Sequence, residues 1–99
     1  MNDLLYLENG EVKISEAAMQ IQEFKDFKRY DTSTNKTYFK WSVNYIYFVY
    51  NVFGEDKSYL ANLSLPQRRM LAVKSNTGPY KKVSDFEENE WVRKCIDAY

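Results

Sequence analysis

A dense run of aromatic residues in the middle of the chain constrains its fold more than any other feature. Residues 38–53 read YFKWSVNYIYFVYNVF, and eight of these sixteen positions are aromatic. The whole chain has seventeen aromatic residues among its 99. A domain of this length buries roughly two-thirds of the surface that its unfolded chain exposes. So much ring area in one segment therefore either forms the centre of the core or partly faces another protein.

Two periodicities compete within this aromatic segment. Residues 39–45 alternate between apolar and polar side chains, which is typical of a strand, but the alternation fails from Ile46 onward. On a helical wheel the polar positions instead gather in one narrow arc. The arc is marked by Lys40, Asn44, Tyr47 and Asn51. We predict a helix from about Thr37 to Phe53, with Gly54 at its C′ position, the arc facing water and the opposite side in the core. A strand over residues 38–45 is the alternative.

The N-terminal part predicts a β-hairpin followed by a helix. Asn9-Gly10 is the residue pair preferred in a type I′ turn, since both turn positions need a positive φ. Short strands over residues 4–7 and 12–14 flank this turn. Ser15 is then a candidate N-cap for one helix that ends near Tyr30.

Two further helices are indicated in the C-terminal half. Pro66 suits the first turn of a helix whose N-cap is Ser64 or Leu65. Ser84 and Glu87 have the spacing of a capping box at the start of a last helix, which runs to about residue 98.

The predicted elements add up to a mainly α fold. We expect one domain over residues 1–99, which is ordinary for this length. A β-hairpin over residues 1–14 should pack on one edge of a small bundle of about four helices over residues 15–99.

The composition argues against catalysis and against a metal or cofactor site. Histidine is absent, which removes the commonest general base and the commonest metal ligand. Cys95 is the only cysteine and lies on an apolar helical stripe, so we expect a core residue rather than a nucleophile. Capping explains the neighbouring carboxylates of Asp85 and Glu87. Three glycines leave no phosphate-binding loop, and we expect no enzyme activity and no cofactor.

Charge is balanced overall but segregated along the chain. The formal net charge is zero and no apolar run reaches the ~20 residues of a membrane span. We therefore expect a soluble, non-secreted protein that binds neither membranes nor nucleic acid in general. Residues 66–82 carry five basic side chains and no acid, whereas residues 84–97 carry five acids and two bases. These are either two solvated faces that attract each other within the fold, or a bipolar surface that orients the molecule between neighbours. A minor alternative is that the basic stretch binds nucleic acid, with Tyr80 stacking on a base.

The tyrosines of the central segment are candidates for a protein interface. Tyrosine is enriched at interfaces because it combines a large apolar ring with a polar tip. Six of the nine tyrosines fall within residues 38–80, and we predict that three of them are partly exposed. The residues that we predict to contact a partner are Tyr47, Tyr50, Tyr59, Arg68 and Arg69. The alternative is that the rings are simply core.

Three consecutive motifs span residues 41–73. The first is the aromatic helix Tyr45-Ile46-Tyr47-Phe48-Val49-Tyr50, and the second is the loop with Ser58-Tyr59. The third is Leu63-Ser64-Leu65-Pro66-Gln67-Arg68-Arg69, an apolar–Pro step that opens a basic helix. This third of the chain resembles small helical virion proteins of tailed bacteriophages of the crAss-like type, although the loop lacks the proline that their pattern has before the tyrosine. The resemblance implies a structural role in the particle and no catalysis.

The residues and the resemblance lead to one functional expectation. We expect a structural or accessory protein of a tailed-bacteriophage virion, assembled in the host cytoplasm. It would bind neighbouring capsid, portal or tail subunits within a large symmetric assembly. The alternative is a small cytosolic regulatory adaptor that binds a host protein or nucleic acid.

Overall fold

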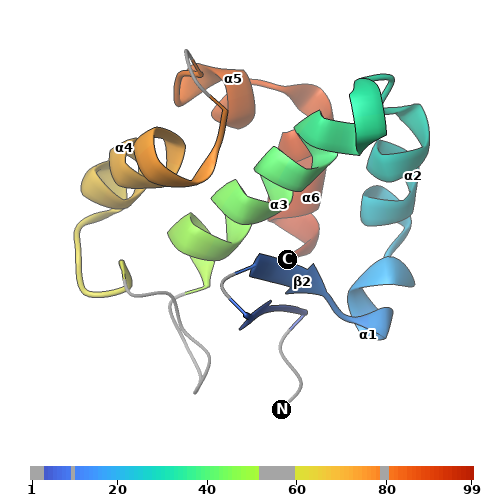
Figure 1. The fold of residues 1–99 in the computed structure, drawn as a ribbon, viewed down its shortest axis with the longest axis horizontal. Helices are drawn as coiled ribbons and strands as arrows, with labels where there is room; N and C mark the ends of the chain where they lie inside the picture. Colours follow the sequence, from blue (N-terminus) through green and yellow to red (C-terminus); the bar gives the residue numbers. More distant parts are fainter. Residues whose placement is uncertain (1–3, 10, 52–59, 79–80) are drawn as a thin grey trace.

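Helices make up most of the molecule and surround one central helix (Figure 1). The computed structural model describes residues 4–9, 11–51, 60–78 and 81–99. It is mainly helical, at 65%, and its described part has four helices of at least seven residues and an N-terminal two-stranded antiparallel hairpin. The predicted fold class is therefore confirmed.

The hairpin has the predicted antiparallel pairing. Strand β1 (Leu5–Glu8) pairs with strand β2 (Glu11–Ile14), in a register that places Leu5 opposite Ile14. Asn9 has a φ of 54°, as a type I′ turn requires, while the turn glycine lies outside the described residues. Leu5 is fully buried, so one face of the hairpin rests on the helical core.

The helix predicted after the hairpin is two helices. α1 (Glu16–Met19) is capped as predicted, because Ser15 Oγ accepts a hydrogen bond from Ala18 N at 3.1 Å. The N–H groups of the next two residues, Gln20 and Ile21, bond to carbonyls three residues back, at 3.2 and 3.0 Å, which tightens and ends the helix. Ile21 follows with an extended φ and ψ of −76° and 124°. α2 (Gln22–Tyr30) therefore starts in a new direction and buries both of its phenylalanines.

α4 (Leu65–Asn76) begins as predicted. Ser64 and Gln67 form a capping box, in which Ser64 Oγ accepts from Gln67 N at 3.4 Å and Gln67 Oε1 accepts from Ser64 N at 3.3 Å. Pro66 lies in the first turn, where its missing N–H removes no helical hydrogen bond.

The predicted last helix is interrupted. α5 (Ser84–Glu87) is a single turn, and α6 (Glu90–Ala98) starts afresh after it. Asn89 caps α6, since its Oδ1 accepts from two N–H groups of the first turn at 2.9 and 3.2 Å. The predicted capping box of Ser84 and Glu87 is wrong, because the Glu87 carboxylate bonds to side chains of other helices instead of to the backbone of α5.

The loop before α3 (Thr37–Tyr50) caps that helix. A short 3₁₀ turn, η1 (Thr34–Lys36), leads into α3 and provides no side-chain cap. Asp31 Oδ2 and Ser33 Oγ accept hydrogen bonds from N–H groups of the first turn of α3, at 2.8 and 2.9 Å. Burial on its own raises the pKa of Asp31, but hydrogen bonds from Ser33 and from the helix outweigh it and hold the pKa below its usual value.

α3 is the central helix. It contacts α4, α6 and both strands (Figure 1), and eight of its fourteen residues are buried. The predicted helix is thus confirmed, and the strand alternative over residues 38–45 is wrong. α3 ends at Tyr50; the predicted C′ residue, Gly54, lies outside the described residues.

The polar arc of α3 does not face water along its whole length. Lys40 is exposed as predicted, whereas Tyr47 is fully buried and Asn51 is 5% exposed. Asn44 is half-buried, and its Nδ2 donates to the carbonyl of Asn76 at 3.0 Å. The prediction is wrong here because α4 packs over α3 and the C-terminal half of the arc is enclosed.

Stacked rings tie α3 to α5. The fully buried ring of Phe86 stacks on Tyr45, with centroids 5.1 Å apart, and on Tyr38, with centroids 5.6 Å apart. Aromatic pairs of this kind contribute about 0.5–1.5 kcal/mol beyond the burial of their area. This stacking fixes the single turn of α5 against the centre of the molecule.

A close approach between Gly78 and Trp41 generates a prediction. Gly78 is buried, and a Cβ placed on it would lie 2.2 Å from Cη2 of the Trp41 ring. Gly78→Ala should therefore lower the free energy of unfolding by about 1–3 kcal/mol, as measured by urea denaturation. The same substitution should cost less in a Trp41→Leu background, where the ring is absent. Equal costs in the two backgrounds would contradict the steric explanation.

Candidate functional site

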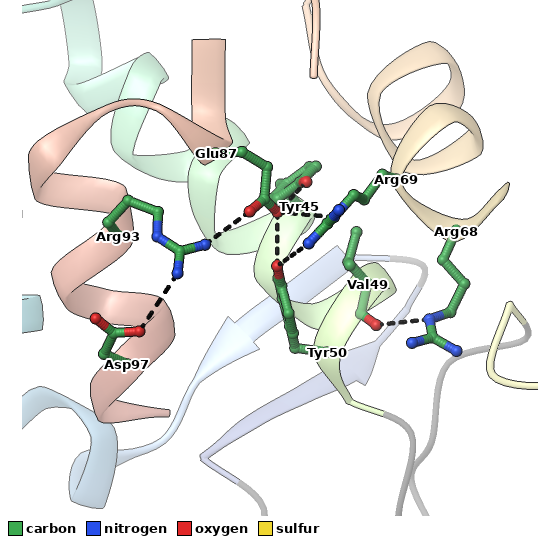
Figure 2. A network of polar contacts seen from close by, with 8 residues as sticks. All are labelled: Tyr45, Val49, Tyr50, Arg68, Arg69, Glu87, Arg93 and Asp97. Carbon is green, nitrogen blue, oxygen red and sulfur yellow. Dashed lines mark hydrogen bonds and ion pairs between the residues drawn. The ribbon is translucent and has the colours of Figure 1, made fainter. Parts of the chain in front are cut away.

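Polar side chains from four helices meet at the carboxylate of Glu87 (Figure 2). We call these residues the Glu87 cluster; its other members are Tyr45 and Tyr50 of α3, Arg69 of α4 and Arg93 of α6. Glu87 Oε2 accepts hydrogen bonds from both phenol hydroxyls, that of Tyr50 at 2.7 Å. Glu87 Oε1 accepts from Arg93 Nη1 at 2.8 Å.

Arg69 contributes to the cluster mainly through its charge. Its Nε lies 3.3 Å from Glu87 Oε2, as an ion pair whose geometry does not make a hydrogen bond. Its Nη2 donates to the Tyr50 hydroxyl at 3.3 Å. The same hydroxyl donates to Glu87, so Tyr50 connects the cation and the carboxylate.

The Glu87 carboxylate is ionised although its side chain is only 13% exposed. Burial on its own raises the pKa of Glu87, but the two phenol hydrogen bonds and the charges of Arg69 and Arg93 outweigh it. The pKa of Glu87 is therefore lower than its usual 4.5. Burial and the adjacent carboxylate raise the pKa of both Tyr45 and Tyr50, which stay protonated and keep donating.

The cluster joins helices of the same chain. Both carboxylate oxygens of Glu87 already accept from donors of the same chain. No member of the cluster lines the groove of about 720 Å³ that runs along α3 from Phe39 to Phe48. A general base must reach the proton that it abstracts, and Glu87 is instead held by four side chains.

Among the described residues, the two segregated stretches of charge meet in one ion pair. Arg69 comes from the basic stretch over residues 66–82, and Glu87 comes from the acidic stretch over residues 84–97. Arg93 is a base within the acidic stretch. Its Nη1 also bonds to Glu87, and its Nη2 lies 3.6 Å from Asp97 Oδ1. These contacts support the interpretation of mutual attraction for this part of the two stretches.

The three tyrosines that we predicted at a partner surface have different environments. Tyr47 is fully buried, so its predicted partial exposure is wrong; its ring packs edge-on to Phe48, with centroids 5.0 Å apart. Tyr50 is half-buried, as predicted, but its hydroxyl belongs to the Glu87 cluster. Tyr59 lies outside the described residues.

The two predicted arginines fasten α4 to α3 (Figure 2). Arg68 Nε donates to the carbonyl of Val49 at 2.9 Å, and Arg68 Nη1 donates to the carbonyl of Leu63 at 2.8 Å. Arg69 reaches the Glu87 cluster from the same helix. Both guanidinium groups thus have partners within the chain, and a contact of either with another protein stays a prediction.

The outer face of α4, which sequence reasoning missed, carries exposed apolar side chains. Met70 is 68% exposed and Leu71 is 38% exposed. The inner face of α4 can be traced through buried Ala72 and Val73 and the inward-reaching Arg69. A helical wheel anchored on those three positions would have placed Met70 and Leu71 outside.

Other chemistry-bearing groups do not assemble into a site within the described residues. Cys95 is fully buried, as predicted, and its thiol donates to the carbonyl of Glu23 at 3.5 Å. No three His, Cys, Asp or Glu residues of the described part are grouped as metal ligands. Among its helices, none combines the length and apolarity needed to cross a membrane.

The Glu87 cluster predicts a specific dependence of stability on pH. Because the folded protein lowers the pKa of Glu87, the cluster stabilises above the unfolded pKa, and that stability is lost as pH falls through the folded pKa. Glu87→Gln should lower the free energy of unfolding by about 1–3 kcal/mol at neutral pH. The difference from the unsubstituted protein should shrink on acidification below 4.5, as followed by urea denaturation at several pH values.

Glu88→Gln is the matched control for this prediction. Glu88 is the next residue and is exposed, and its substitution by Gln removes the same charge. It should change stability by less than about 0.5 kcal/mol. If Glu87→Gln behaved like Glu88→Gln across the pH range, the stabilising role of the cluster would be refuted.

The thiol of Cys95 should be inert in the folded protein. Burial raises the pKa of Cys95 to about 12, and the thiolate is the reactive form. A thiol-specific disulfide reagent should therefore react with the unfolded chain in guanidinium chloride at once and with the native protein only at the rate of unfolding. Rapid labelling of the native protein would show that the thiol is accessible.

Comparison with known proteins does not assign the chain to a family. No protein-family model, no curated protein and no solved structure matches it significantly.

Proposed function

We propose that this chain is a structural or accessory protein of a tailed-bacteriophage virion that binds neighbouring capsid, portal or tail subunits. The observation that carries the proposal is the outer face of α4, where the consecutive residues Met70 and Leu71 are both exposed. Methionine is enriched at protein interfaces and adapts its shape to a partner.

The inner side of α4 holds this face in a fixed position. Arg68 bonds to the end of α3, and Arg69 bonds to the Glu87 cluster. The helix therefore cannot turn its apolar side chains inward without breaking these contacts. A rigid helix that presents Met70 and Leu71 loses little conformational entropy when a partner covers them.

The charge of α4 indicates what kind of surface would cover it. The helix carries Arg68, Arg69 and Lys74 and no acid, and exposed Lys74 lies one turn after Met70 and Leu71. A neighbouring subunit with an apolar patch and an acidic rim would match this face.

The resemblance to phage virion proteins supports the same surface. The resembling stretch, residues 41–73, includes most of α3 and most of α4. Its basic helix is therefore the helix whose outer face is exposed. The absence of catalysis that the resemblance implies agrees with the Glu87 cluster, whose donors and acceptors bond to one another.

Particle composition tests this proposal. The phage that encodes the chain is purified, and the copies of the protein per particle are measured by quantitative mass spectrometry. We expect a fixed copy number. Met70→Glu should reduce incorporation by about tenfold or more, because it buries a charge at an apolar contact.

Gln20→Glu is the control, since Gln20 is exposed at the C-cap of α1 and its substitution adds the same charge away from α4. It should be incorporated normally. Absence of the unsubstituted protein from purified particles, with recovery bound to a host protein or nucleic acid instead, would refute the proposal and favour a regulatory adaptor. Normal incorporation of Met70→Glu would refute the role of the outer face of α4.

A further inference from the structure

The groove along α3 has an apolar floor and lies beside the hairpin. On α3 the lining consists of Phe39, Val43 and Phe48, which form the floor and are at most 6% exposed, and of the polar residues Lys40 and Asn44. β2, together with residues of α2 and η1, forms the walls; Figure 1 shows the hairpin next to α3. Within the described structure this concave surface is separate from the outer face of α4.

The wall formed by β2 is the edge of the strand. All four residues of β2 line the groove, and no residue of β1 does. Alternate side chains of a strand point to opposite faces of the sheet. A surface that touches four consecutive residues therefore borders the edge of β2 and not one of its faces.

The backbone groups on this edge are available for pairing. Ser15 N donates to the carbonyl of Leu4 at 2.9 Å, so Leu4 and Ser15 are a hydrogen-bonded pair. Hydrogen-bonded and non-hydrogen-bonded pairs alternate along an antiparallel ladder, so Tyr6–Lys13 and Glu8–Glu11 are the hydrogen-bonded pairs of this register. Val12 and Ile14 therefore direct their N–H and C=O groups away from β1. Neither backbone forms a hydrogen bond to another described residue.

The groove is positively charged. Its lining contains four lysines and one acid, Glu11, which pairs with Lys13 at 2.9 Å. Lys36 Nζ donates to the carbonyl of Asp31 at 2.6 Å. Lys28 and Lys40 are exposed at the rim and make no ion pair with another described residue.

A buried donor in the lining also lacks an acceptor. Asn76 Nδ2 is inaccessible to solvent and has no hydrogen-bond partner in the described structure, and Asn76 lines the groove at the end of α4. A buried donor without a partner is unfavourable.

We propose that the groove binds an acidic, extended segment of a partner protein, which adds to the edge of β2 as a third strand. Its backbone pairs with Val12 and Ile14, as in other cases of β-strand addition. Its apolar side chains pack on the floor of α3, and its acidic side chains reach Lys28 and Lys40. The four residues of β2 span ~13 Å, which suits a segment of about four to five residues.

This binding site extends the proposed function without depending on it. The groove and the outer face of α4 are different surfaces, so each can bind a partner without the other. The site requires only that some partner exposes a segment in which apolar and acidic residues alternate, because strand side chains alternate between the two faces.

The test uses the purified protein and a synthetic probe. The probe is a fluorescent peptide of alternating valine and glutamate with blocked ends, and its binding is measured by fluorescence anisotropy and by hydrogen exchange. We expect saturable binding that weakens with added salt, and slower exchange of the Val12 and Ile14 amides. Lys28→Gln with Lys40→Gln should weaken binding by about tenfold or more, as lost charge pairing implies.

Two controls separate strand addition from simple charge attraction. Lys25→Gln with Lys82→Gln removes the same charge from exposed lysines that do not line the groove, and it should leave binding unchanged. A peptide of the same sequence with N-methylated backbone amides keeps its charge but cannot pair with β2, and it should bind at least about tenfold more weakly.

Several outcomes would overturn the inference. These are no binding at millimolar peptide, equal binding of the N-methylated peptide, and equal loss in the two lysine pairs. Pairing of two copies of this chain through β2, which the peptide does not displace in analytical ultracentrifugation, would also overturn it. Met70→Glu should bind the peptide normally, because Met70 does not line the groove. Failure of the peptide to bind would therefore refute this site and not the proposed function. Failure of the protein to enter particles would refute the proposed function and not this site.

Discussion

The fold depends on an ionised carboxylate that is almost shielded from water. A charged group in such a position costs several kcal/mol unless it is paired and hydrogen-bonded. Glu87 obtains its partners from α3, α4 and α6 at once. Only an arrangement that brings those helices together satisfies it, so the carboxylate favours one packing of the helices over looser alternatives. Arg69, one of its two cations, also helps to hold α4 with Met70 and Leu71 directed outward.

The same requirement explains why so many rings of α3 are tyrosines. Phenylalanine would supply equal apolar area but no donor. The hydroxyls of Tyr38, Tyr45 and Tyr50 all reach α5, the first at the carbonyl of Asp85 and the others at Glu87. Burial raises the pKa of Tyr38 to about 12, so this hydroxyl remains a donor far above neutral pH. Tyr45 and Tyr50 of the aromatic segment thus bind a mostly buried charge, and the described rings of the segment are buried or half-buried.

The sequence predicted correctly those elements that depend on interactions between residues close together in the chain. The hairpin, the Ser64 cap and the helix over α3 follow from turn chemistry and periodicity within a few residues. The role of Glu87 was out of reach, because its spacing from Ser84 imitates a capping box while its true partners lie 42 and 37 residues away. The break before α6 had a local sign in Asn89, a good N-cap, but only the burial of Phe86 shows why the chain bends there. The exposure of Tyr47 was misjudged because the wheel of α3 does not show that another helix covers it.

The lysines beside β2 have a second consequence, which concerns copies of the chain meeting one another. A strand with an unpaired edge is a template on which identical molecules can pair and aggregate. Two β2 edges brought together would also bring together the positive rims at Lys28 and Lys40. Like charges at short range repel, so the arrangement disfavours self-association at this edge. The positive charge that favours binding of an acidic segment thus also disfavours self-association of the unoccupied protein.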